Sequence, residues 1–143
     1  MITIMKNKSG RSFVTITIVI ALMALFLRIA VERIIKITIS QNESGALATL
    51  KLISTALENY AKNNVGIYPV SLSVLTQTRP PYLDKDYITL SPFKGYAYSF
   101  SRLEPYSYSC QAAPVQCNLT GRTIYTIIAG GSLMSEECAK KES

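Results

Sequence analysis

The sequence predicts an α+β protein in which a long N-terminal helix, half membrane segment and half amphipathic, packs on a small antiparallel β-sheet of about three strands. Three observations lead to this fold class. An apolar run at Phe13–Val31 continues into a charged helical pattern without a turn residue. Apolar side chains then recur at helical spacing over residues 46–60. Segments in which aromatic and small residues alternate strictly follow after residue 95.

The apolar run has a length that suits a membrane. As a helix, Phe13–Leu27 would span about 22 Å, and extension to Val31 gives about 28 Å, against about 30 Å for the core of a bilayer. The extension includes Arg28, which could snorkel or pair with Glu32 one turn later. Positive charges flank both ends, so the positive-inside rule only weakly favours a cytoplasmic N-terminus. The residues after Leu27, RIAVERII, make a poor signal-peptidase site, and we expect the helix to remain in the mature protein.

The helix is predicted to continue as an amphipathic segment. Its apolar stripe consists of Ala46, Leu50, Ile53, Leu57 and Tyr60. Steps of three and four residues place these side chains on one face, which we expect to pack on a domain core. The sequence NNVG at Asn63–Gly66 predicts the C-terminal cap of this helix.

The remaining residues are predicted to form a β-rich region with a polar tail. Pro69 marks the start of a short helix that Leu72 and Leu75 would anchor, and TRPPYLDKDY reads as an extended connector. Three strands are expected, in GYAYSFS, YSYSC and RTIYTIIAGG. The tail SEECAKKES is expected to be loose.

The composition argues against most catalytic chemistry. The chain has no His, which is the commonest general base and the commonest metal ligand. No Ser or Thr has a base to activate it, and no Gly-rich phosphate loop is present, so we expect neither an enzyme nor a cofactor. The net charge of +6 is spread along the chain without a Lys/Arg-rich run that aromatic residues interrupt. No specific nucleic-acid partner is therefore predicted.

The three cysteines predict one disulfide and one remaining thiol in an oxidising compartment. Cys110 and Cys117 flank QAAPVQ and could bridge across the turn between two strands. A bridge from one of them to Cys138 is the alternative.

The order of these motifs resembles that of the type IV pilins and the pseudopilins of type II secretion. The resemblance rests on a Lys-containing leader that ends in Gly10, an uncut apolar helix, and the motifs YP..L..L, PPYLD, GYAYSF and GRTIY in that order. It covers nearly the whole chain. It implies a pilin-like fold with a leader at 1–10, a transmembrane and filament-core helix at 11–41, an amphipathic continuation at 42–64, and an exported globular region at 65–143.

Resemblance to this family implies that an inner-membrane prepilin peptidase removes the leader and methylates the new N-terminus. We expect the cut between Gly10 and Arg11. A cut between Ser12 and Phe13 is the alternative, because the family usually reads Gly-Phe-Thr-Leu-Ile-Glu at this point. The resemblance would therefore place cleavage before the apolar helix rather than after it.

This sequence departs from the family at the position of the usual Glu, where Thr15 or Thr17 stands in the two registers. The helix-kinking Pro of many members is also missing. A Thr cannot neutralise the N-terminal amine in a filament core, so we expect a minor, initiating or tip-proximal subunit. Some pseudopilins bind Ca²⁺, and Asp84 and Asp86 are weak candidates for such a site. A pair of carboxylates in DKD is more often simply solvated, so no metal site is predicted.

The resemblance implies a structural subunit of the bacterial inner membrane, with a single span, a cytoplasmic N-terminus and an exported C-terminal domain. It would then assemble into a type IV pilus or a type II secretion pseudopilus. The implied partners are other pilin or pseudopilin subunits, the prepilin peptidase, the inner-membrane assembly platform and the membrane. The alternatives are a non-polymerising single-pass membrane protein with an exported binding module and, with least support, an enzyme on a membrane stalk.

Overall fold

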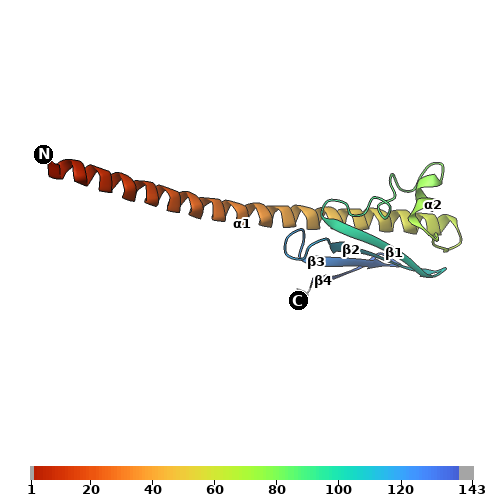
Figure 1. Cartoon of the computed structure of the whole chain (residues 1–143). Coiled ribbons are helices and arrows are strands. Elements are labelled where there is room, and N and C mark those ends of the chain that lie inside the picture. The colour runs from red at the N-terminus through yellow and green to blue at the C-terminus, as the bar shows by residue number, and fades with distance from the viewer. Residues whose placement is uncertain (1, 139–143) are drawn as a thin grey trace. The chain divides into compact units, whose positions relative to one another are not determined.

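The computed structural model describes the backbone of residues 2–138 and the side chains of residues 10–138. It divides into two compact units, Met1–Lys36 and Ile37–Ser143. The helices are α1 (Ile2–Asn63) and α2 (Leu72–Gln77). The strands are β1 (Tyr96–Glu104), β2 (Ser107–Pro114), β3 (Thr123–Ile128) and β4 (Ser132–Glu137) (Figure 1). The predicted α+β fold class is confirmed.

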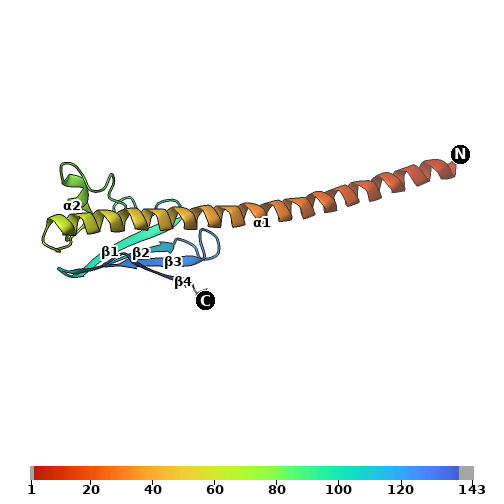
Figure 2. The same cartoon turned by 180° about the vertical axis from the view of Figure 1, so that it is seen from behind.

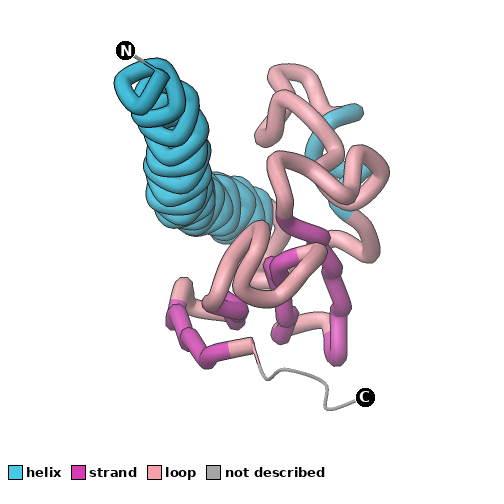
Figure 3. The backbone as a smooth tube through the Cα atoms, turned by 60° about the vertical axis from the view of Figure 1, so that its left-hand side comes forward, coloured by secondary structure: helices cyan, strands magenta, loops and turns pink. Residues whose placement is uncertain are grey.

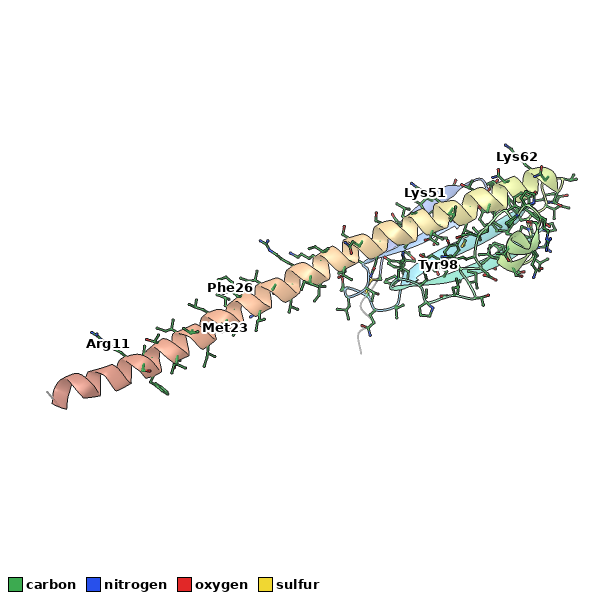
Figure 4. All side chains as sticks on the ribbon, turned by 90° about the horizontal axis from the view of Figure 1, so that it is seen from above. Arg11, Met23, Phe26, Lys51, Lys62 and Tyr98 are labelled. Carbon is green, nitrogen blue, oxygen red and sulfur yellow. A yellow bond between two sulfur atoms is a disulfide. The ribbon has the colours of Figure 1, made fainter. Side chains whose placement is uncertain are left out.

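The first unit is helical throughout its described residues. No Pro occurs before Pro69, and Gly10 and Gly45 are the only glycines in α1, so nothing in the sequence interrupts the hydrogen-bond ladder. All side chains from Arg11 to Ile34 are exposed. Figure 4 shows the side chains of Met23 and Phe26 projecting from this part of the helix.

The second unit is built on the amphipathic part of α1. Ala46, Leu50, Ile53 and Leu57 are at most 2% exposed, and Tyr60 is half-buried, which confirms the predicted stripe. These side chains form one core with aromatic residues of the sheet. Burial of a Leu or Ile side chain contributes roughly 1.5–3 kcal/mol to folding, so the stripe is the main attachment of the sheet to this segment.

The sheet is a four-stranded antiparallel meander in the order β1-β2-β3-β4. Its strands are drawn in magenta in Figure 3. The alternation predicted for the first strand is confirmed, because Tyr96 and Tyr98 are buried while Ala97 and Ser99 are exposed. The face that carries the tyrosines packs on α1, because Tyr96 and Tyr98 belong to the same core as the stripe. In Figures 1 and 2, α2 and the sheet lie on different sides of α1.

The fourth strand is a correction to the predicted count of about three. The expected loose tail begins at Ser135, but Ser135 to Glu137 belong to β4, where Ser135 pairs with Tyr125. All six residues of β4 are exposed. An edge strand of this kind lacks the alternation of apolar and polar residues that identifies a strand in sequence. The last five residues of the tail, 139–143, lie outside the described residues, and their looseness stays a prediction.

The end of α1 has the predicted cap, and two predicted element boundaries are shifted. Gly66 has a φ of +79° and its N–H donates to the Ala61 carbonyl at 2.7 Å, which is the expected cap. The short helix begins at Leu72 rather than at Pro69, although its anchors are buried as expected. Tyr106 lies in the turn between β1 and β2, so the second strand starts one residue later than its alternation indicated.

Candidate functional site

The exposed apolar segment of α1 is the first candidate for function. By length and composition, the helix over Gly10–Asn63 contains a window that can cross a membrane, and none of the described residues in that window is buried. Phe13 is 74% exposed and Phe26 is 69% exposed. A continuous apolar surface of this kind is rare on soluble monomers and marks a membrane or protein contact.

Both predicted cleavage points lie inside α1. Gly10, Arg11, Ser12 and Phe13 are helical and exposed. A Cβ at Gly10 would meet no neighbouring atom, so space alone does not require this glycine. The side chains of leader residues 1–9 lie outside the described residues. Cleavage at either point stays a prediction.

Thr15 and Thr17, the two threonines singled out in the sequence, both bond to the backbone of their own helix. Thr15 Oγ1 donates to the Arg11 carbonyl at 2.6 Å, and Thr17 Oγ1 donates to the Phe13 carbonyl at 2.9 Å. Each hydroxyl therefore has an acceptor one turn earlier, as Ser and Thr commonly do in helices. Neither side chain carries a charge that could balance an amine.

Arg28 and Glu32 form the ion pair that the sequence indicated, with 3.7 Å between Arg28 Nε and Glu32 Oε1. Both side chains are well exposed, so in water the pair contributes little to stability. In an apolar environment, however, a partner one turn away lowers the cost of keeping each charge. Arg33 and Lys36 follow on the same helix and add two further positive charges.

The disulfide joins Cys117 to Cys138, with Cα atoms 5.8 Å apart, so the predicted Cys110–Cys117 pairing is wrong and the alternative partner of Cys117 holds. The reason is the path of the chain. Cys110 lies on β2, and each strand residue advances the chain by about 3.3 Å, so Cys117 lies well beyond the end of that strand. The N–H of Cys138 donates to the Arg122 carbonyl at 2.8 Å, which brings the end of β4 next to the loop that holds Cys117.

Cys110 is the remaining thiol, and it lies in the core. Its side chain has no exposed surface, and burial raises the pKa of the thiol to about 12. The nucleophilic form of cysteine is the thiolate, so this thiol is unreactive at neutral pH. Cys110 therefore acts as a small apolar core residue.

The two weak calcium candidates are engaged in a local turn. Asp86 Oδ1 accepts the N–H groups of Ile88 and Thr89 at 3.0 and 3.3 Å, and Oδ2 accepts the Thr89 hydroxyl at 2.9 Å. Asp84 Oδ1 accepts the Tyr87 hydroxyl at 3.2 Å. Among the described residues no group of three or more His, Cys, Asp or Glu side chains converges on a metal position.

A polar network that joins α1 to the sheet and the loops was not predicted from the sequence. Ser54 is a buried polar residue of the core, and its hydroxyl lies 3.0 Å from that of Tyr108. The carboxylate of Glu58 accepts hydrogen bonds from Tyr68, Tyr108 and the backbone of Gly130. Burial, and then the hydrogen bond to Glu58, raise the pKa of Tyr68. In the sequence, Ser54 and Glu58 each directly follow a residue of the apolar stripe. This position was the only sign that their side chains reach the core.

A second polar contact joins α1 to the loop between β2 and β3. Asn42 Nδ2 donates to the Thr120 carbonyl at 2.9 Å. Glu43 Oε1 accepts the Arg122 N–H at 2.8 Å and the Thr123 hydroxyl at 3.2 Å. The loop that carries the disulfide is thus held against the helix by side chains that face the sheet.

Comparison with known proteins found no relative of this chain: no protein-family model, no curated protein and no solved structure matches it.

Proposed function

We propose that this protein is a pilin-like structural subunit, inserted in the bacterial inner membrane as a precursor and assembled through α1 into a type IV pilus or a type II secretion pseudopilus. One observation carries the proposal. The single uninterrupted helix α1 includes both a fully exposed apolar segment and an amphipathic segment packed on an antiparallel sheet. A helix of this kind suits a subunit whose apolar segment lies in lipid before assembly and among neighbouring helices afterwards.

The proposed topology is a single span with the N-terminus in the cytoplasm and the second unit exported. An exported location is consistent with a disulfide at Cys117–Cys138, because such bonds persist in oxidising compartments. The partners would be other pilin or pseudopilin subunits, a prepilin peptidase and the inner-membrane assembly platform.

Processing by a prepilin peptidase tests the proposal directly. The full chain is co-expressed in membranes with an active or an inactivated peptidase, and its intact mass is measured. We expect loss of residues 1–10 and gain of one methyl group only with the active enzyme. Gly10→Leu should leave a full-length precursor, whereas Gly45→Ala, a glycine change elsewhere in α1, should be processed normally.

Two other values of the intact mass would change the interpretation. A mature N-terminus at Phe13 would move the cut to the alternative site and would leave the family assignment in place. A chain that stays intact with an active peptidase would contradict the proposal and favour a non-polymerising single-pass membrane protein with an exported binding module.

A minor role in the filament follows from the missing Glu. Assembly would place the N-terminal amine in a low-dielectric helix bundle, where an unpaired charge is costly. The hydroxyls of Thr15 and Thr17 are already bonded to backbone carbonyls and cannot neutralise it. At the tip of a filament one layer of neighbouring helices is absent, so the amine would remain partly solvated. We therefore expect this subunit at low copy number.

Quantification of the subunit in sheared filaments checks this expectation. Thr15→Glu or Thr17→Glu should raise incorporation, while the matched uncharged changes Thr15→Gln and Thr17→Gln should not. If the subunit makes up most of the filament mass, or if neither Glu variant raises incorporation, the argument from the missing carboxylate fails.

A further inference from the structure

A groove opens at the C-terminal end of α1, within the second unit. One wall comes from the last turn of α1 and the residue after it, with Tyr60, Asn63 and Asn64. The other comes from α2 and the connector that follows it, with Arg79 and Tyr82 among its residues. Figures 1 and 2 show α2 and its flanking loops beside this end of α1.

The groove is lined by aromatic and proline rings. The rings of Tyr60 and Tyr82 are half-buried and meet edge to face, with centroids 5.7 Å apart. Pro80 and Pro81 are exposed beside them. Aromatic rings and proline rings hold little conformational freedom, so a ligand that stacks on them orders few additional side-chain torsions.

The polar groups of the groove are positioned by bonds among themselves. Asn63 Nδ2 donates to the Tyr82 hydroxyl, and Asn64 Nδ2 donates to the Tyr60 carbonyl, both at 2.8 Å. These bonds use the amide nitrogens and fix both side chains with their carbonyl oxygens available as acceptors. The Tyr82 hydroxyl can still donate its own hydrogen. Arg79 is exposed and makes no hydrogen bond or ion pair with any described residue.

The residues that line the groove argue against a metal ion and against a purely apolar ligand. A metal ion would need carboxylates, and none of the described lining residues is acidic. A purely apolar ligand would leave the amide oxygens and the guanidinium without partners. A sugar ring has an apolar face of C–H groups and a rim of hydroxyls that both donate and accept, which matches aromatic and proline rings edged by acceptors and donors.

We propose that this groove binds a neutral pyranose unit of a glycan. The apolar face of the sugar stacks on the tyrosine and proline rings. Its hydroxyls donate to the amide oxygens of Asn63 and Asn64, and Arg79 and the Tyr82 hydroxyl donate to its oxygens. The proposal goes beyond the filament function and does not depend on how the chain is cleaved or assembled.

The test uses the full chain in lipid nanodiscs, because many detergents carry sugar headgroups that would compete. The probes are maltotetraose, cellotetraose, tetra-N-acetylchitotetraose and tetragalacturonate, and binding is measured by saturation-transfer NMR and calorimetry. We expect saturable binding of at least one of the three neutral probes. Arg79→Ala should weaken it by about tenfold, the typical effect of one lost charge-assisted hydrogen bond.

Two further variants make the test specific. Lys62→Ala removes the same charge from the exposed last turn of α1 without altering the lining, and should change affinity by less than about twofold. Tyr82→Phe keeps the ring but removes the hydroxyl that positions Asn63, and should weaken binding by about threefold or more. Circular dichroism verifies that each variant is folded.

Two results would overturn the proposal. The first is no binding of any neutral probe. If tetragalacturonate then binds alone and Arg79→Ala and Lys62→Ala weaken it equally, the chain attracts acidic polymers in general. The second is neutral-probe binding that Arg79→Ala and Tyr82→Phe both leave unchanged.

Discussion

Glu58 accepts a hydrogen bond of 2.9 Å from the backbone N–H of Gly130, which ties α1 to the turn between β3 and β4. The same carboxylate lies 3.1 Å from the Tyr68 hydroxyl and 3.3 Å from the Tyr108 hydroxyl. One side chain therefore joins the helix to the loop that follows it, to β2 and to the hairpin. The Tyr68 and Tyr108 side chains are buried and their hydroxyls need an acceptor, whereas the bond from Gly130 is exposed.

Glu58→Ala is expected to lower the free energy of unfolding by about 1–3 kcal/mol, because the buried Tyr68 hydroxyl loses its acceptor. The Tyr108 hydroxyl can still bond to Ser54, and the exposed Gly130 N–H can bond to water. Glu58→Gln keeps one acceptor oxygen in place and should lower it by about 1–2 kcal/mol. Asn59→Ala, at the exposed neighbouring position, is the matched control and should stay within about 0.5 kcal/mol of the parent. Chemical unfolding followed by circular dichroism measures all three. Equal effects of Glu58→Ala and Asn59→Ala would contradict the role given to the carboxylate.

We expect the attachment of β4 to the sheet to depend on the disulfide, because all six residues of the strand are exposed. The bridge closes a sequence separation of 21 residues, for which loop entropy predicts about 3 kcal/mol of stabilisation. Replacing Cys117 and Cys138 together by Ser should cause that loss and should speed amide hydrogen exchange over residues 132–137. Cys110→Ala, which leaves the bridge intact, should leave β4 as protected as in the parent. Unchanged protection in the double variant would show that backbone pairing with β3 suffices.

Stability is expected to fall in alkaline solution. Burial raises the pKa of the Cys110 thiol to about 12, and burial also raises the pKa of Tyr96 and Tyr108 above the usual range. The unfolded chain therefore releases these protons at lower pH than the folded chain. The contribution of these groups to the free energy of unfolding is fully present below about pH 8.5. It is lost as pH rises, by up to about 1.4 kcal/mol per pH unit for each group.

Unfolding free energies measured between pH 7 and pH 11 test this. Cys110→Ala removes the first group to ionise, so its decline should begin near the tyrosine value of about pH 10 instead. A parent and a variant with the same onset would show that the thiol makes no contribution to the alkaline loss.

Two glycines of the second unit should respond oppositely to alanine. A Cβ at Gly121 would lie 2.6 Å from Cζ of Tyr96, which is fully buried and donates to the Thr123 carbonyl. Gly121→Ala should therefore lower the free energy of unfolding by about 1–3 kcal/mol. A Cβ at Gly45 meets nothing within 4 Å, so Gly45→Ala should raise it by about 0.5–1 kcal/mol through helix propensity. Thermal unfolding of both variants measures the difference, and a fall for both would rule out the propensity argument.

The elements with a strong periodic pattern could be predicted from the sequence. Leu50, Ile53 and Leu57 repeat with the helical period and form the buried face of α1, because burial and periodicity have the same cause. Tyr96 and Tyr98 alternate with small residues and are buried for the corresponding reason in a strand. β4 could not be found in this way, since a strand with every side chain exposed leaves no pattern.

Contacts that depend on the path of loops could not be predicted from the sequence. The partner of Cys117 depends on where β4 ends. The positions of the three cysteines in the sequence do not show where that strand ends. The network of Glu58 depends on the hairpin turn at Gly130 reaching the helix. The groove at the end of α1 likewise requires the chain reversal at Gly66, which brings a connector with no periodic pattern back to the last helical turn.

The hydroxyls of Thr15 and Thr17 would enter a hydrocarbon phase already paired, because each donates to its own backbone. An unpaired hydroxyl in alkane costs about 4–8 kcal/mol, and internal pairing removes much of that cost. The partition of α1 into a bilayer is therefore more favourable than a count of its polar side chains indicates. The uncharged stretch from Ser12 to Leu27 still spans only about 24 Å. A thick bilayer would have to thin around it or draw in the Arg28–Glu32 pair, so hydrophobic mismatch would favour thin membranes.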